Sequence, residues 1–203
     1  MFEKNGKEVG ALEKTDVIAF FDRCAGTWDA ETIRNEDVIR TILDNAAVRS
    51  GIDVLDVACG TGVLFPDYFA RRVASVTGID ISPGMASRAR EKFPQATVLC
   101  ADAETYPFRR DFDTVMVYNA LPHFPEPGRL IEALAPLVRK DGRLSVAHGM
   151  SRAMLARHHS GAASGVSVEL PEAEALAEML APWFDVDVVI SDDRMYQVAG
   201  RRR

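Results

Sequence analysis

The chain of 203 residues has few cysteines and no long apolar run. Cys24, Cys59 and Cys100 are an odd, scattered set without a Cys-x-x-Cys motif, which argues against a disulfide framework and favours a reducing compartment. Segment 1–14 is polar and charged, unlike a signal peptide, and no stretch approaches the ~20 apolar residues that span a bilayer. These absences predict a cytoplasmic protein that does not associate with a membrane.

Basic charge is scarce as well. The 24 lysines and arginines are outnumbered by 30 aspartates and glutamates, which gives a formal net charge of −6. A nucleic-acid partner requires a basic surface, and the one basic run, Arg201 to Arg203, is interpreted as a solvated tail. The sequence therefore predicts no nucleic-acid partner. Its 47% hydrophobic and 27% charged residues are ordinary for a single globular domain of this length.

The order of segments along the chain predicts the fold class. Two helices come first, one capped by Thr15 or Asp16 and one over 39–46, with a turn at 26–29 between them. Seven strands are expected at 53–58, 75–80, 96–100, 113–118, 143–147, 186–190 and 195–199. Further helices are expected at 62–70, after Ser82-Pro83, over 127–138 and at 171–181. This alternation predicts an α/β fold with a doubly wound, mostly parallel seven-stranded sheet, one antiparallel strand and helices on both faces.

A glycine-rich turn follows the first buried strand. The strand runs from Val54 into the segment Ala58-Cys59-Gly60-Thr61-Gly62. In doubly wound sheets a ligand binds at the carboxyl ends of the strands, where the strand order reverses. Gly60 and Gly62 allow the backbone to approach such a ligand closely, and Asp56 adds a carboxylate at the base of the turn.

Polar side chains also end the next three strands. Asp80 follows Asp56 by 24 residues, close to the ~20-residue offset at which an acid meets ribose hydroxyls in nucleotide-binding sheets. The third strand leads into Asp102, and the fourth ends at Tyr118 and Asn119. Each acid alone is equally compatible with a helix cap or a turn. Their joint order, after a glycine turn and at βαβ spacing, favours a nucleotide cleft.

Four segments resemble the successive motifs of class I S-adenosylmethionine-dependent methyltransferases. They are Leu55 to Gly62, Gly78 to Met85, Ala101 to Phe108 and Phe112 to Val115. With Phe21 to Asp29 they are most similar to the branch that includes the ubiquinone and menaquinone methyltransferases and many small-molecule enzymes. The resemblance extends from about residue 20 to about residue 150. It implies that 51–203 form a Rossmann-like methyltransferase domain on which 1–50 pack as a helical cap segment.

The resemblance also implies a set of residues that bind S-adenosylmethionine. They are Asp56, Ala58, Gly60, Gly62, Asp80, Ile81, Met85, Asp102, Ala103, Tyr118 and Asn119. Asp56 and the turn after it would hold the methionine part, and Asp80 would accept hydrogen bonds from both ribose hydroxyls. Asp102 would accept from the adenine amino group. Ala58 departs from the pattern, because many relatives have glycine there, although alanine is common in this branch.

The candidates for catalysis and acceptor binding lie in the second half of the chain. His123 follows the fourth strand and His148 ends the fifth, and these strand ends face the same cleft, so each is a candidate base or substrate contact. Tyr118 is a third catalytic candidate, because the resemblance implies that it lies near the sulfonium and the entering substrate. Each histidine is also compatible with an ordinary hydrogen-bonded loop position. His158 and His159 fall in 149–169, which is expected to cover the cleft as a short lid, and no spacing indicates a metal site.

Other functions are disfavoured by specific residues. A nicotinamide-binding Gly-x-Gly-x-x-Gly motif would need glycine where Phe65 stands. The segment from Asn119 to Pro122 lacks the tetrad of amino-methylating nucleic-acid enzymes. The sequence thus favours methyl transfer to a small-molecule acceptor by in-line displacement. A non-catalytic S-adenosylmethionine-binding protein, or a protein or nucleic-acid methyltransferase, stays open as an alternative. Neither the acceptor nor the oligomeric state follows from the sequence.

Overall fold

The computed structural model describes residues 12–159 and 165–203. Seven strands form one sheet: β1 (Asp53–Val57), β2 (Ser75–Asp80), β3 (Thr97–Cys100), β4 (Phe112–Tyr118), β5 (Val138–His148), β6 (Phe184–Ser191) and β7 (Tyr196–Arg202). The α-helices are α1 (Lys14–Cys24), α2 (Trp28–Glu31), α3 (Glu36–Asn45), α4 (Phe65–Ala70), α5 (Pro83–Lys92), α6 (Pro127–Leu134), α7 (Arg152–His159) and α8 (Ala173–Leu180). Two short 3₁₀ turns, η1 (Leu121–His123) and η2 (Ala135–Leu137), complete the elements of this part of the chain.

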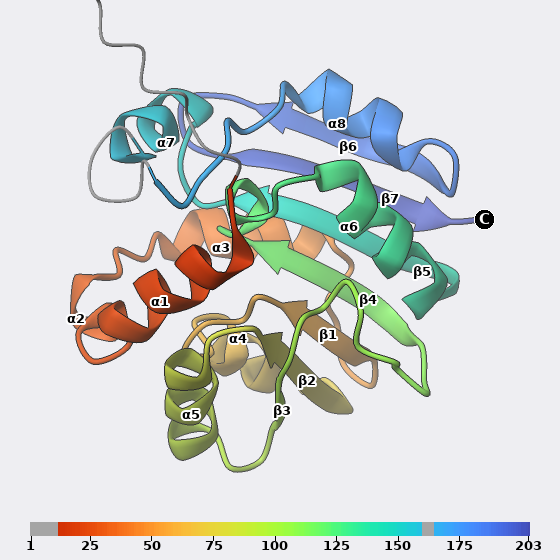
Figure 1. The fold of residues 1–203 in the computed structure, drawn as a ribbon. Coiled ribbons are helices and arrows are strands. Elements are labelled where there is room, and N and C mark those ends of the chain that lie inside the picture. Colours follow the sequence, from red (N-terminus) through yellow and green to blue (C-terminus); the bar gives the residue numbers. More distant parts are fainter. Residues whose placement is uncertain (1–11, 160–164) are drawn as a thin grey trace, which may run out of the picture.

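The sheet has the strand order β3-β2-β1-β4-β5-β7-β6 (Figure 1). Strands β1 to β5 pair in parallel, and β7 runs antiparallel to both of its neighbours, β5 and β6. The predicted doubly wound, mostly parallel sheet with one antiparallel strand is confirmed. The strand order reverses between β1 and β4, which is where ligands bind in such sheets.

Both faces of the sheet are buried, which explains the nearly continuous apolar runs in its central strands. Val54 and Met116 belong to a hydrophobic cluster with α3, α4 and α5. Leu55 and Val115, which are register partners in β1 and β4, belong to a second cluster with α6 and α8. Successive residues of a strand point to opposite faces, so each central strand contributes to both clusters.

Two helices differ from their predicted bounds because of proline and glycine. The helix predicted over 127–138 ends at Leu134, because Pro136 has no N–H for a helical hydrogen bond, and Val138 already begins β5. The helix predicted at 62–70 begins at Phe65. Gly62 has a φ of +82°, which is outside the helical region.

The amino-terminal helices also depart from expectation. The N-cap of α1 is Glu13 rather than Thr15 or Asp16, and no side chain caps this end. The predicted turn at 26–29 is shorter, because Trp28 begins the single-turn helix α2. At the other terminus, the basic run is not a solvated tail: Arg202 lies in β7, with its guanidinium 5.6 Å from the ring centroid of Phe184.

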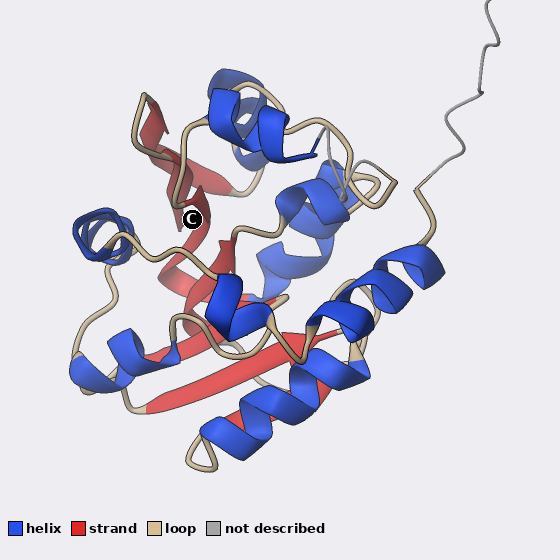
Figure 2. Cartoon of the chain, turned by 90° about the vertical axis from the view of Figure 1, so that its left-hand side faces the viewer, coloured by secondary structure: helices blue, strands red, loops and turns tan. Residues whose placement is uncertain are grey.

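The segment before β1 divides into two parts with different packing. Helix α3, capped by Asn35, buries Val38, Ile39, Ile42 and Leu43 in the cluster below the sheet. Helices α1 and α2 lie beside the carboxyl ends of the parallel strands (Figures 1 and 2). No residue of α1 or α2 belongs to either hydrophobic cluster, and α1 buries only Val17. We call α1 and α2, residues 14–31, the helical cover.

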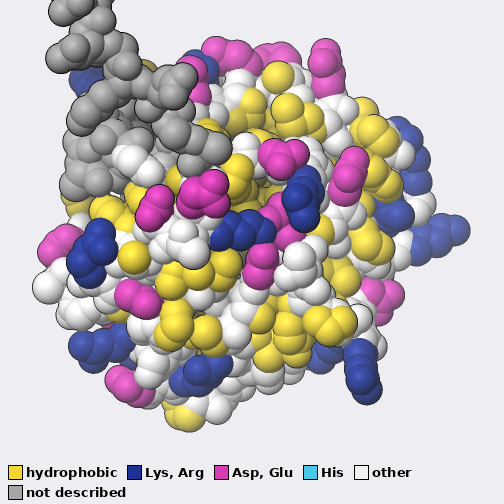
Figure 3. Space-filling model, viewed as in Figure 1, with side chains coloured by type: hydrophobic (Ala, Val, Ile, Leu, Met, Phe, Trp, Pro, Cys, Tyr) yellow, Lys and Arg dark blue, Asp and Glu magenta, His cyan; other side chains and the backbone are white. Residues whose placement is uncertain are grey.

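In the view of Figure 3, acidic and basic side chains of the described residues are interspersed with apolar areas, and among these residues neither sign of charge forms one large patch. Within 12–159 and 165–203, every helix is too short or too polar to cross a bilayer.

Candidate functional site

A cavity lies between the helical cover and the carboxyl ends of β1, β2, β3 and β4. Its volume is about 1010 Å³, including the part open to solvent. It brings together most of the predicted site residues: Asp56, Ala58, Gly60, Asp80, Ile81, Met85, Asp102, Ala103, Tyr118, Asn119 and His123. Gly62 and His148 lie outside its lining. The cavity therefore occupies the point at which the strand order reverses.

The glycine turn requires left-handed backbone at several positions. Ala58, Gly60 and Gly62 have φ values of +53°, +55° and +82°. The left-handed φ gives a physical reason why glycine suits the position of Ala58. A Cβ on Gly62 would lie 2.8 Å from the ring of Phe93 and 2.9 Å from that of Phe65. Gly62 therefore allows close packing of the turn against α4 and the end of α5, on the side away from the cavity.

Asp80 fixes the turn with its carboxylate. One oxygen accepts from the backbone N–H of Gly60 at 2.8 Å, and the other accepts from that of Ser82 at 2.9 Å. Burial raises the pKa of Asp80 to about 6, although these two hydrogen bonds favour the ionised form. The carboxylate thus connects the end of β2 to both loops that border the cavity.

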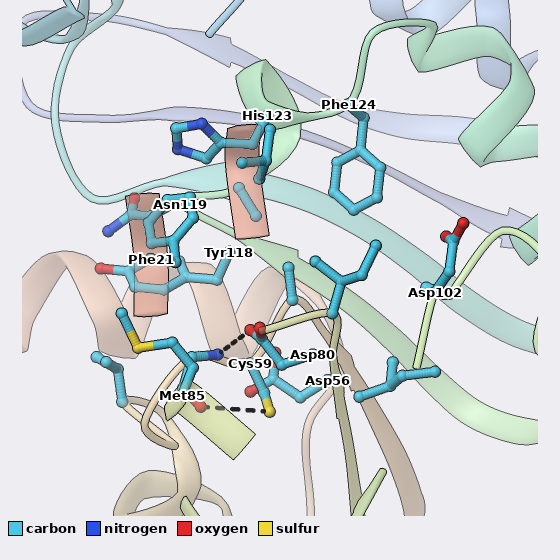
Figure 4. A pocket seen from close by; sticks show the side chains of 18 of the residues that line it. Phe21, Asp56, Cys59, Asp80, Met85, Asp102, Tyr118, Asn119, His123 and Phe124 are labelled. Carbon is cyan, nitrogen blue, oxygen red and sulfur yellow. Dashed lines mark hydrogen bonds between the residues drawn. The ribbon is translucent and has the colours of Figure 1, made fainter. Parts of the chain in front are cut away.

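Asp56 is a second buried carboxyl beside Asp80 (Figure 4). Its side chain is only 2% exposed, and burial raises its pKa to about 8, with a further contribution from the charge of Asp80. Two neighbouring acids with raised pKa values gain free energy when a cation binds beside them, because the cation favours their ionised forms. This end of the cavity is therefore suited to a positively charged ligand.

Asp102 contacts the helical cover. Its carboxylate accepts from the Lys14 ammonium at 2.6 Å, and Lys14 also forms an ion pair with Glu104. Partial burial lowers the pKa of Lys14, but the hydrogen bonds to the two acids outweigh this effect and hold the pKa above its usual value. The remaining oxygen of Asp102 accepts from the backbone N–H of Glu104 at 3.0 Å. No local sequence pattern points to Lys14, because its partners are 88 and 90 residues away.

Two further acids fasten the cover to the sheet domain. Asp22 of α1 accepts from the Ser82 hydroxyl at 2.5 Å and from the backbone N–H of Gly84 at 2.9 Å, at the start of α5. Asp29 of α2 accepts from the Thr61 hydroxyl at 2.5 Å, and from Lys92. Polar contacts therefore hold the cover where apolar packing is sparse.

Tyr118 and Asn119 border the cavity at the end of β4. Asn119 is left-handed, with a φ of +54°, which asparagine tolerates better than most residues. Its side-chain oxygen accepts from the backbone N–H of Gly149 at 2.9 Å. A Cβ on Gly149 would overlap the Tyr118 hydroxyl, so glycine at this position leaves room for the tyrosine ring in its observed place. Burial raises the pKa of Tyr118 to about 12, which makes it a poor base near neutral pH.

The histidines separate into different environments. His123 lines the cavity, with its Nδ1 atom 2.8 Å from the Val166 carbonyl and its ring centroid 4.8 Å from that of Phe21. His148 is fully buried at the end of β5, with its ring centroid 6.0 Å from that of Tyr196. His158 and His159 end α7, and their side chains lie outside the described part of the structure, as do residues 160–164 of the predicted lid.

The three cysteines are unbonded and differ in exposure. Cys59 is buried in the glycine turn, and burial raises its thiol pKa well above the usual value. Cys24 is half-buried, whereas Cys100 is exposed and directly precedes the cavity residue Ala101. Among the described side chains, no three histidines, cysteines or acids converge as a metal site would require.

Comparison with known proteins shows which family has this architecture. Residues 55–146, which run from β1 to β5 and include the glycine turn, match the family model described as a methyltransferase domain. The chain belongs to the class I S-adenosylmethionine-dependent methyltransferase family. The matched residues contain every predicted cofactor-binding position.

Two sequence relatives and one solved structure illustrate this methyltransferase family. The chain is 30% identical to malonyl-[acyl-carrier protein] O-methyltransferase from Acetivibrio thermocellus, over 66% of this chain and 49% of the relative. It is 36% identical to nocamycin O-methyltransferase from Saccharothrix syringae, over 62% of this chain and 48% of the relative. The chain thus spans about half the length of these curated relatives.

One structural neighbour is N-methyltransferase NodS from Bradyrhizobium japonicum WM9, solved in complex with S-adenosyl-L-homocysteine. The TM-score is 0.72 at 13% identity, and the match covers 91% of this chain and 97% of the other. At this identity the likeness concerns the fold. It matches nearly the whole length of a methyltransferase with the same Rossmann-like architecture.

Proposed function

We propose that this chain binds S-adenosylmethionine in the cavity and transfers its methyl group to a small-molecule acceptor by in-line displacement. The observation that carries the proposal is the pair of buried carboxyls, Asp56 and Asp80, beside the left-handed turn at the switch point of the sheet. Both acids have raised pKa values, which suits a ligand that brings positive charge into a buried site.

The residues of the cavity fit this donor from one end to the other. Asp56 and the turn at Gly60 are suited to the cationic methionine part, since a carboxylate and close-approaching backbone meet there. Asp80 has lone pairs left for the ribose hydroxyls after accepting its two backbone hydrogen bonds. Asp102 and Ala103 are suited to the adenine edge, and Met85 offers an apolar contact for its ring.

The bound donor supplies a methyl group already activated by its sulfonium. The protein therefore has to align the acceptor with the methyl group and exclude water, which is mainly catalysis by proximity and orientation. Tyr118 and Asn119 lie at the end of β4 that faces the cavity, where they are suited to orient the acceptor. The helical cover excludes water through Phe21 and Trp28, whose ring centroids are 5.5 Å apart.

A small-molecule acceptor is supported by the relatives and by the surface. One of the sequence relatives, nocamycin O-methyltransferase, is named for nocamycin rather than for a protein or a nucleic acid. On the face shown in Figure 3, the described lysines and arginines lie apart from one another and do not line up as the basic track that binds a phosphate backbone. We further propose that the cap segment is limited to the helical cover, residues 14–31. We also infer a cytoplasmic location, because the three cysteines are unbonded, as is usual in a reducing compartment.

Isothermal titration with S-adenosylmethionine, S-adenosylhomocysteine and NADH tests the proposal. We expect S-adenosylmethionine and S-adenosylhomocysteine to bind and NADH not to bind. The variant D80N is expected to bind the two sulfur ligands at least tenfold more weakly. The matched control is Q95A, because Gln95 is exposed in the loop before β3, away from the cavity lining. A folded protein that binds neither sulfur ligand would overturn the proposal. Binding without methyl transfer to any acceptor would support a non-catalytic protein instead.

A further inference from the structure

Asp102 lies in the cavity wall just beyond the end of β3, apart from Asp56 and Asp80 (Figure 4). One of its carboxylate oxygens accepts from the Lys14 ammonium at 2.6 Å, and the other accepts from the backbone N–H of Glu104 at 3.0 Å. Lys14 also donates to the carboxylate of Glu104. Lys14, Asp102 and Glu104 thus form a closed ring of contacts, in which the Asp102 carboxylate cannot turn without breaking a hydrogen bond.

Glu104 anchors Lys14 within this ring. The side chain of Glu104 is only 3% exposed, and its second oxygen lies 3.9 Å from the Nε atom of Arg129. A nearly buried carboxylate is costly without a close positive charge, so Glu104 keeps the Lys14 ammonium beside Asp102. The position of Lys14 is therefore fixed by the protein itself.

Asp102 retains acceptor capacity for a ligand in the cavity that it lines. A carboxylate has about four lone-pair sites, so the two hydrogen bonds of the ring leave about two sites for a ligand. An ionised carboxylate accepts hydrogen bonds and donates none, so it attracts an amino group and repels a carbonyl oxygen. Adenine carries an exocyclic amino group where hypoxanthine, a base of almost the same shape, carries a carbonyl oxygen. A fixed Asp102 therefore discriminates between these bases, because hypoxanthine would place one acceptor against another.

A second lysine fastens the helical cover in a different way. Lys92 at the end of α5 forms an ion pair with Asp29 of α2 at 2.7 Å, and its side chain is 34% exposed, compared with 35% for Lys14. Lys92 and Asp29 lie outside the cavity lining, whereas Lys14 and Asp102 belong to it. The two ion pairs therefore allow attachment of the cover to be separated from the position of Asp102.

We propose that Lys14 is a positioning residue for recognition of the adenine base: it holds Asp102 as the acceptor for the exocyclic amino group. This inference rests on the proposed function, in which Asp102 meets the adenine edge. Lys14 acts through Asp102 and requires no contact of its own with the base. Because Lys14 belongs to α1, the helical cover then takes part in selecting the base of the methyl donor.

Calorimetry with S-adenosylhomocysteine and S-inosylhomocysteine, which carries hypoxanthine in place of adenine, tests this role. The unmodified protein should prefer S-adenosylhomocysteine by about tenfold or more, because a hydrogen bond to a charged group is lost with the other ligand. In K14M this preference should fall by about threefold or more, because Asp102 loses the ion pair that fixes it. D102N should abolish the preference, because an amide presents a donor as well as an acceptor to either base.

The matched control is K92M, which removes an equally exposed lysine that fastens the cover and should leave the preference unchanged. K14R should restore most of the preference, because a guanidinium can donate to both acids. Equal binding of the two ligands by the unmodified protein would overturn the inference and leave the proposed function intact. An unchanged preference in K14M, or an equal loss in K92M and K14M, would also overturn it. If S-adenosylhomocysteine does not bind the folded, unmodified protein, the proposed function fails and this inference fails with it.

Discussion

The floor of the cavity, formed by Asp56, Asp80 and the turn from Ala58 to Gly60, continues directly from the buried strands β1 and β2. The helical cover, in contrast, belongs to neither hydrophobic cluster and is held mainly by Lys14, Asp22 and Asp29. A part of a protein with few buried apolar contacts opens at lower free-energy cost than its core. If the proposed function holds, this difference predicts that the floor is preformed and selects the ligand, and that the cover opens to admit it.

The largest expected effect comes from removing the acid that connects the floor to both loops. D80A should weaken S-adenosylmethionine binding by at least 100-fold in calorimetry. It should also lower the free energy of unfolding by about 1–3 kcal/mol, because the N–H groups of Gly60 and Ser82 lose their acceptor. D80N keeps one carbonyl acceptor and should lose less stability. A D80A protein with unchanged affinity would show that the floor does not select the ligand.

Stability and affinity should also depend on pH through the floor, because Asp56 and Asp80, whose pKa values are raised by burial, both belong to it. Asp56 and Asp80 have pKa values of about 8 and 6, above the usual 3.8, so the ligand-free folded protein binds more protons than the unfolded chain between about pH 4 and pH 8. The free energy of unfolding should therefore fall as the pH rises through this window. Binding a cation lowers both pKa values and releases protons, so affinity should rise by up to about tenfold per pH unit for each proton released.

Titrations between pH 5.5 and 8.5 in two buffers of different ionisation enthalpy measure this proton release directly. In D56N the release attributable to Asp56 should be lost. Proton uptake, or an affinity independent of pH in the unmodified protein, would contradict the assignment of Asp56 and Asp80 to a cationic ligand.

A smaller effect is expected from the ion pairs of the cover. K14M removes the contacts to Asp102 and Glu104 but leaves the floor intact. Since a partly exposed ion pair contributes about 0.2–1 kcal/mol, association and dissociation rates of S-adenosylmethionine should each rise by up to about fivefold. Stopped-flow fluorescence of Trp28 would follow both rates, with K140M on the exposed β5 segment as the matched control. Rates unchanged from the unmodified protein would mean that α1 does not limit ligand exchange.

The smallest expected effect concerns backbone strain within the floor. Ala58 adopts a φ of +53°, which costs a non-glycine residue about 1–2 kcal/mol, partly offset by the greater flexibility of glycine in the unfolded chain. A58G should therefore raise the free energy of unfolding by up to about 1 kcal/mol in urea titrations. The matched variant A70G, at the end of α4, should instead lower it. A destabilised A58G would indicate that the methyl group of Ala58 contributes packing to the floor.

The floor and the helical cover also differ in how well the sequence predicts them. The floor is local in sequence: Asp56, Gly60 and Asp80 lie at strand ends whose apolar pattern and spacing identify them, and the alternation of strands and helices predicts the mostly parallel sheet. The fastening of the cover depends on side chains such as Lys14 and Asp22, whose partners lie 60 to 90 residues away along the chain. No local pattern records such pairs.

Two predicted site residues show a different limit. Gly62 belongs to the same motif as Gly60, yet a Cβ on Gly62 would meet the ring of Phe93 at 2.8 Å, whereas one on Gly60 would face Trp28 of the cover at 3.9 Å. His148 ends β5 on the predicted edge of the sheet but is buried beside Tyr196. The sequence pattern therefore placed both residues correctly at the carboxyl ends of their strands or just beyond. Whether each residue faces the cavity depends on packing, which the pattern does not show.

The difference in exposure between the cysteines allows the position of the cover to be followed with a label. The thiol of Cys59 is buried and disfavours the reactive thiolate, whereas Cys100 is exposed and separated from Asp102 by a single residue. A thiol-specific fluorophore should therefore label Cys100 first, next to the acid that Lys14 contacts. A change in its emission on addition of S-adenosylmethionine would show whether α1 moves relative to Asp102, without the introduction of any new side chain.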